Sequence, residues 1–111
     1  MQPLMRDATT VLLRAVRERF GTFTGLTVDR IASRSWASAT FTGSRHDLDL
    51  RLEGEGAEAK ADAFLEQLDE AEFQLRGHIL ADIKLIAQRR HRGLAGMVVM
   101  LSLEALTVED C

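Results

Sequence analysis

A regular alternation of polar and apolar side chains between Ser35 and Glu53 constrains this chain more than any other feature of its sequence. In the clearest stretch, charged residues separate Leu48, Leu50 and Leu52. A period of two predicts an extended strand, because successive side chains leave opposite faces of a pleated backbone. One apolar face and one polar face indicate an antiparallel sheet that is covered on one side only. We therefore expect a layered protein.

Helical and strand periodicities divide the whole chain into seven predicted elements. In order, these are a helix over 3–20, strands over 26–33, 36–42 and 46–53, a helix over 57–71, and strands over 79–86 and 97–106. Gly43-Ser44-Arg45 is the predicted turn of the first hairpin, since turns favour glycine. Arg89 to Gly96 is expected to form a basic turn between the last two strands.

The order α-β-β-β-α-β-β predicts an α+β fold with two layers. Two helices would cover one face of an antiparallel five-stranded sheet. Ala37 and Ala39 are expected on the covered face, together with the alternating leucines. Residues 1–111 form a single expected domain, because no linker, repeat or low-complexity tract interrupts them.

Charge and composition disfavour several classes of function. The net charge of -3 provides no strong cationic field, so we expect no nucleic-acid partner. No apolar run approaches the ~20 residues that span a bilayer, so we expect no membrane partner. Cys111 is the single cysteine, and the first residues do not resemble a signal peptide because they include Arg6 and Asp7. These features predict a cytoplasmic protein.

The uncovered face of the predicted sheet carries apolar residues where a wet surface would be polar. They are Trp36, Ile86, Val98, Met100 and Leu106. Contiguous exposed apolar patches mark interaction surfaces, and aromatic residues and methionine are enriched in interface cores. A homodimer is the expected outcome, since two-fold association is the commonest kind. The alternative is that sheet twist and loops shelter these side chains.

Positive charge is concentrated in the expected basic turn, at Arg89, Arg90 and Arg92. Guanidinium groups bind carboxylates and phosphates with two hydrogen bonds. The second predicted helix is acidic, so the turn could meet this helix on another copy, or a protein partner, through complementary charge. The alternative is a solvated hairpin tip whose charges discourage aggregation.

Three residues suggest a pocket, because His46 and His78 both open predicted strands and Asp82 lies near the second of them. Nitrogen and oxygen ligands of this kind suit zinc or iron in principle. The spacing matches no metal motif, however, and no nucleophile elbow or phosphate-binding glycine pattern is present. We predict no catalytic residue and no cofactor. A small-ligand or metal-binding enzyme that uses these histidines remains an alternative.

The predicted succession of a helix, three strands, a helix and two strands resembles the core of the type III secretion chaperones. The resemblance covers most of the length, although the final helix common in that family is missing. It implies an alternative function, the binding of unfolded protein segments. The residues themselves favour a non-enzymatic interaction module that acts through its exposed sheet face.

Overall fold

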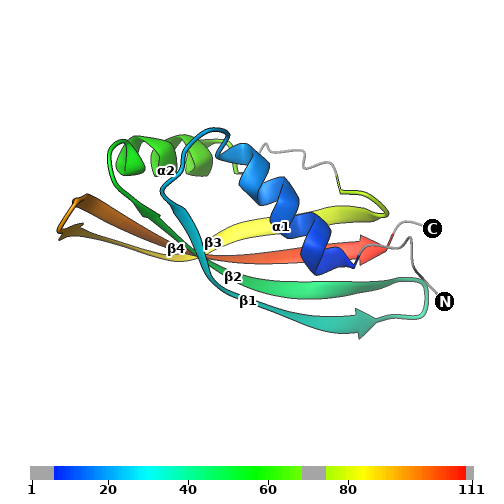
Figure 1. The fold of residues 1–111 in the computed structure, drawn as a ribbon. Helices are drawn as coiled ribbons and strands as arrows, with labels where there is room; N and C mark the ends of the chain where they lie inside the picture. Colours follow the sequence, from blue (N-terminus) through cyan, green and yellow to red (C-terminus); the bar gives the residue numbers. More distant parts are fainter. Residues whose placement is uncertain (1–6, 69–74, 110–111) are drawn as a thin grey trace.

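The computed structural model describes residues 7–68 and 75–109. Its elements are α1 (Ala8–Arg19), β1 (Leu26–Ala37), β2 (Thr42–Glu53), α2 (Ala57–Glu66), β3 (His78–Gly93) and β4 (Gly96–Glu109). The four strands form one antiparallel sheet in the order β1-β2-β4-β3. Both helices lie on the same face of this sheet (Figure 1). The predicted α+β class with two layers is therefore confirmed.

Local sequence explains where α1 begins and ends. The carboxylate of Asp7 accepts a hydrogen bond of 2.7 Å from the backbone N–H of Thr10, which satisfies one of the free donors of the first turn. This bond, together with a hydrogen bond from the Thr10 side chain, lowers the pKa of Asp7. Gly21 follows the helix with a positive φ of 56°, a conformation that glycine adopts without strain. The predicted start at Pro3 lies outside the described residues.

Helix α2 packs through small residues. Ala57 and Ala61 are buried, so the helix lies close to β4 and β2. Phe64 stacks on Phe20, which follows α1, with 4.7 Å between the ring centroids. The two helices are thus joined above the sheet. The helix ends at Glu66; part of its predicted extension, 69–71, lies outside the described residues.

The core lies between the helices and the two central strands. Leu48, Leu50 and Leu52 of β2 are at most 1% exposed, as the alternation predicts. Alternate residues of β4 face them, including Leu101 and Leu103. Burial of a leucine side chain stabilises a fold by about 1.5 to 3 kcal/mol, so these two strands anchor the structure.

The prediction of five strands in the order α-β-β-β-α-β-β is wrong, because the sheet has four strands. Strand β1 continues from Leu26 to Ala37 and joins two segments that were predicted to be separate. The turn lies at residues 38–41, where the Ser38 N–H donates to the Phe41 carbonyl at 2.7 Å. Because the resemblance to the type III secretion chaperones depended on the predicted order, its basis is absent.

Gly43 lies inside β2 for a packing reason. The prediction of a turn at Gly43-Ser44-Arg45 is therefore wrong. A Cβ atom at this position would be 2.0 Å from the Thr107 carbonyl oxygen and 2.9 Å from Cζ2 of Trp36. Glycine in a strand often marks such a close approach. Ala37 ends β1 and Ala39 lies within the true turn; both are exposed, so they are not part of the covered face.

The expected basic turn also proves to be strand. Residues 89–92 belong to β3 and pair with β4, and the actual turn is Leu94-Ala95. Consecutive side chains of a strand leave opposite faces. Arg89 and Arg90 therefore point to different sides of the sheet and do not form one cluster.

Candidate functional site

A chain of hydrogen bonds surrounds His46, which is fully buried on the helix side of β2. Ser33 Oγ lies 2.7 Å from His46 Nδ1, and Thr9 Oγ1 of α1 lies 2.7 Å from Ser33 Oγ. On the other side of the ring, Nε2 is 2.9 Å from Thr107 Oγ1. The Thr107 hydroxyl donates to the Ser44 carbonyl at 3.3 Å. This polar network joins α1, β1, β2 and β4.

The direction of each bond in the network follows from its last acceptor. A carbonyl oxygen can only accept, so the Thr107 hydroxyl donates its single proton to the Ser44 carbonyl oxygen. The Thr107 oxygen must therefore accept a hydrogen bond from Nε2–H of His46. In a neutral ring Nδ1 then accepts from the Ser33 hydroxyl, and Ser33 Oγ accepts from Thr9. The geometry therefore assigns a proton to Nε2, which leaves Nδ1 as the acceptor when the ring is neutral.

Burial lowers the pKa of His46, and the positive form of nearby His78 lowers it further, while Asp47 and Asp7 oppose the shift. A neutral base hydrogen-bonded to a serine is half of a hydrolase arrangement. The third position, however, holds the Thr107 hydroxyl, where a triad holds a carboxylate. The ring nitrogens of His46 thus connect β1 to β4 through Ser33 and Thr107.

The three predicted pocket residues are not brought to one place. His78 is half-buried and lies close enough to affect the pKa values of His46 and Asp7. Asp82 pairs with Leu106 on the outer face of the sheet, opposite the helices, whereas His46 faces the helices. Within residues 7–68 and 75–109, no group of three or more histidine, cysteine, aspartate or glutamate side chains could hold a metal ion.

Sequence reasoning did not find Thr9, Ser33 and Thr107 as members of the polar network. A usable signal exists for two positions. Thr107 continues the inward-facing series of Leu103 and Ala105 on β4, and His46 precedes the inward leucines of β2. A polar residue in an apolar alternating series indicates a buried hydrogen bond. The contact with Ser33 depends on strand pairing and has no local signal.

The outer face carries its apolar residues at two ends. At one end, Trp36, Gly43, Val108 and Ile79 form one row across the four strands. Trp36 is half-buried, and its indole Nε1 is buried with no hydrogen-bond partner among the described residues. Ile79 is 52% exposed. We call this row the Trp36 end.

The other predicted interface residues lie apart from the Trp36 end, except Leu106 in the next row. Val98 is 7% exposed, Met100 is half-buried, and Ile86 is 57% exposed. The region between the ends is polar and contains the ion pairs Arg30–Asp49, Arg51–Asp29 and Lys84–Glu104. The apolar residues therefore do not form one continuous patch. An interface that includes them stays a prediction.

The arginines of β3 have separate environments. Arg90 forms ion pairs with Glu58 and Asp62 of α2 at 3.4 and 2.7 Å, and this contact raises its pKa. The acidic helix and this arginine thus meet within one molecule. Arg89 borders a shallow depression of about 230 Å³ on the outer face. Arg92 is exposed near the hairpin tip.

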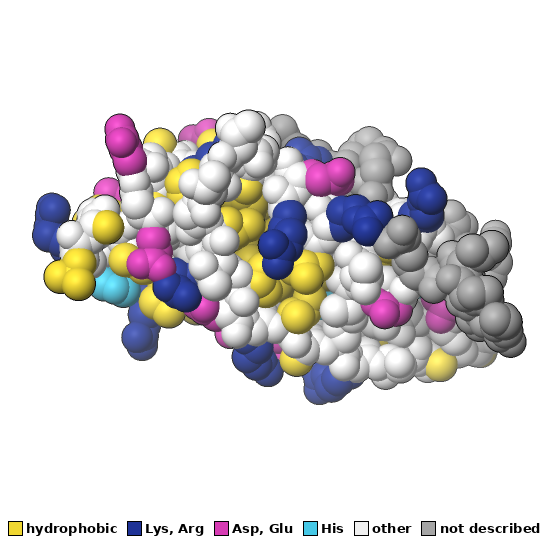
Figure 2. Space-filling view, viewed as in Figure 1, with side chains coloured by type: hydrophobic (Ala, Val, Ile, Leu, Met, Phe, Trp, Pro, Cys, Tyr) yellow, Lys and Arg dark blue, Asp and Glu magenta, His cyan; other side chains and the backbone are white. Residues whose placement is uncertain are grey.

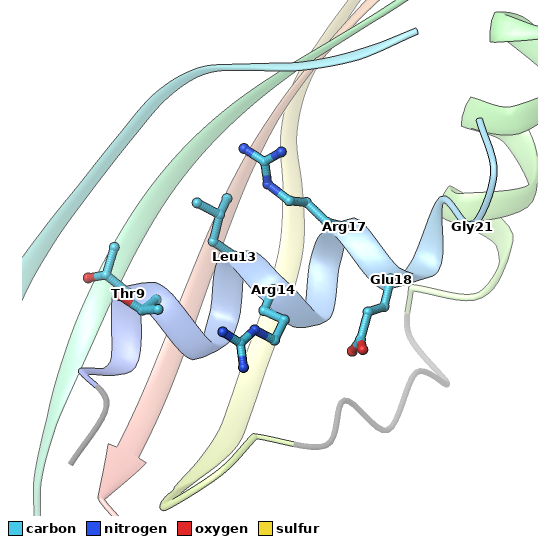
Figure 3. A pocket seen from close by; sticks show the side chains of 7 residues that line it. Thr9, Leu13, Arg14, Arg17, Glu18 and Gly21 are labelled. Carbon is cyan, nitrogen blue, oxygen red and sulfur yellow. The ribbon is translucent and has the colours of Figure 1, made fainter. Parts of the chain in front are cut away.

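A larger surface pocket of about 510 Å³ follows α1 and is lined by Thr9, Leu13 and Arg17, among others. Figure 3 shows that Arg17 points to the opposite side of the helix from Arg14 and Glu18. Binding pockets normally combine a concave apolar wall with a few convergent polar groups. The side chains of α1 do not converge, so this pocket has no built recognition site.

Comparison with known proteins identifies a similar fold. No protein-family model matches the sequence, and no curated protein matches it. The structure is similar to a chain in the virion of a native gene transfer agent (GTA) particle, with a TM-score of 0.63 and 16% identity. The alignment covers 94% of this chain and 96% of that chain. The likeness is one of fold. No helix in the described part of the chain is long and apolar enough to span a membrane.

Proposed function

We propose that this chain is a non-enzymatic structural subunit of a protein particle. One observation carries the proposal: the fold similarity to the gene transfer agent chain extends over almost the full length of both chains. A likeness of this extent involves the complete arrangement of two helices and one sheet, and not a common hairpin. Repeated subunits make most particles, so the expected partner is another copy of this chain.

The surface of the protein supports self-association. Ile79 and Phe41 are 52% and 58% exposed, and the nearby indole N–H of Trp36 has no acceptor among the described residues. A neighbouring subunit would cover these side chains and could supply the acceptor. A homodimer is the smallest assembly of this kind, and assembly in the cytoplasm agrees with the composition. Another protein of the particle could occupy the same surface.

Sedimentation velocity and light scattering over a concentration series test this function. We expect a species heavier than the 12.4 kDa monomer whose population grows with concentration. Trp36→Ala should weaken association at least tenfold if the Trp36 end is covered, while circular dichroism reports whether the variant is folded. Leu94→Ala is the matched control, because Leu94 is a fully exposed apolar residue at the hairpin tip. A monomer throughout the series would contradict the proposal.

A further inference from the structure

The two outer strands of the sheet offer unusually long free edges. β1 has 12 residues and β3 has 16, and neither pairs along its outer edge with any strand of the described residues. Such an edge is a template for another chain unless charges, bulges or cover protect it. Figure 2 shows hydrophobic side chains gathered on the surface between α1 and β1. The β1 edge therefore adjoins apolar surface.

The directions of these strands allow the sheet to continue from one copy into the next. Each neighbouring pair in β1-β2-β4-β3 is antiparallel, so β1 and β3 themselves run in opposite directions. A second copy placed beside the first in the same orientation would set its β1 antiparallel to β3. The helices of both copies would then lie on the same side, and the core layer would be continuous.

The rows of the sheet define which residues would meet. One outer row runs from Arg34 on β1 through Arg45 and Leu106 to Asp82 on β3. If the row continues into the next copy at the same level, Asp82 lies opposite Arg34. The bulge at Leu80/Asp82 interrupts this register before the Trp36 end is reached.

One pair of charges at the two edges, Arg34 and Asp82, is complementary, while Arg30 and Lys84 on the same edges already form ion pairs with Asp49 and Glu104 within the chain. Arg34 lies directly opposite Arg45 on the same face, and neither forms an ion pair with a described residue. Like charges in directly opposed positions destabilise a sheet. Asp82, on the other edge, also lacks an ion-pair partner among the described residues. The carboxylate of a neighbouring copy would relieve the repulsion between the two arginines.

Apolar residues complement each other on the helix side as well. One row on the helix side consists of Ile31, Leu48, Leu103 and Leu85. Its two edge residues, Ile31 and Leu85, are only partly buried. Continuation at the same level would bring Leu85 of one copy against Ile31 of the next. The pair would extend the hydrophobic core across the contact.

We propose that the segment Asp82–Leu85 of one copy pairs antiparallel with Ile31–Arg34 of the next copy. The inference rests on the proposed function, a subunit that associates with itself, and names the surface that it uses. Both segments are free of bulges, whereas bulges lie at Val28/Arg30, Leu80/Asp82 and Leu85/Ala87. Bulges bend the rest of each edge away, which confines the pairing to one register. The contact is head-to-tail, so it generates a ring or a filament.

Disulfide trapping tests this register directly. Arg34→Cys and Asp82→Cys are combined in a chain that also carries Cys111→Ser. Within one copy the two positions are separated by three strand spacings, about 14 Å, which is too far for a disulfide. Mild oxidation should therefore yield a ladder of covalent oligomers. Each single-cysteine chain should stay monomeric in a denaturing gel.

Charge exchange provides a second readout. Arg34→Glu alone and Asp82→Arg alone should each weaken association at least tenfold in sedimentation experiments. An equal mixture of the two variants should regain association, because each junction then joins opposite charges. Arg14→Glu and Glu66→Arg make the same charge changes on exposed helix positions and should have no effect.

The outcomes separate this inference from the proposed function. A self-associating protein that neither cross-links nor responds to charge exchange would overturn the edge contact and leave the structural subunit intact. A covalent dimer of the Arg34→Cys chain alone would indicate two-fold pairing of β1 with β1, which also overturns it. A protein that is monomeric at every concentration would contradict both.

Discussion

His46 couples the stability of this protein to pH, because its ring is buried and neutral. Its pKa lies below the ordinary value of 6.5, so the unfolded chain binds the proton more readily than the folded chain does. The free energy of unfolding is therefore highest above about pH 6.5 and falls as the pH decreases toward the lowered pKa. Protonation of the Asp7 carboxyl group also lowers the free energy of unfolding, but only at a pH below the ordinary pKa of 3.8.

Urea denaturation between pH 8 and pH 5, a range of about three units around the ordinary histidine pKa, measures this coupling. The natural protein should lose stability across the range. His46→Gln should be less stable at the upper end and show a flatter dependence, since its side chain does not titrate. His91→Gln, at an exposed position, should keep the natural slope. Parallel curves for the natural protein and His46→Gln would exclude His46 as the source.

At the scale of elements, the close contact between β2 and β4 at Gly43 explains why a glycine lies inside a strand. Glycine is required there by the Thr107 carbonyl and the Trp36 ring, and the chain reverses five residues earlier, at Ser38. Local pattern reasoning assigns glycine to turns because it cannot detect a neighbouring strand. The alternating leucines of β2 were predicted correctly, because a period of two is a property of the strand itself.

Gly43→Ala should destabilise the protein by about 2 to 3 kcal/mol, because the added methyl group forces the two central strands apart. Ser44→Ala is the matched control on the same strand, where a Cβ atom already exists and the backbone carbonyl is kept. Its effect should be about 0.5 kcal/mol, as is usual for substitutions without a special packing role. Equal urea midpoints for Gly43→Ala and the natural protein would refute the packing argument.

At the scale of the whole molecule, the balance of charge and apolar surface determines how copies would associate. The Arg34–Asp82 contact proposed between copies would lie at a solvent-exposed edge, where salt screens ion pairs. Association should therefore weaken as ionic strength rises. The double variant Arg34→Gln/Asp82→Asn should associate more weakly at low salt and respond little to added salt. Association that strengthens with salt would instead assign the contact to apolar burial at the Trp36 end.

Periodicity within the sequence was sufficient to determine the class of fold and the covered face of β2, because the spacing of apolar side chains is local. The same spacing placed Trp36 on the uncovered face of a strand, but it could not say that Trp36 and Asp82 lie on strands at the two free edges of the sheet. Contacts between distant segments determine the strand order and the extension of β1 over residues 26–37. They also bring Thr9, Ser33 and His46 into one hydrogen-bonded network. Only the tertiary structure decides these, since backbone pairing and close packing join residues that share no local pattern.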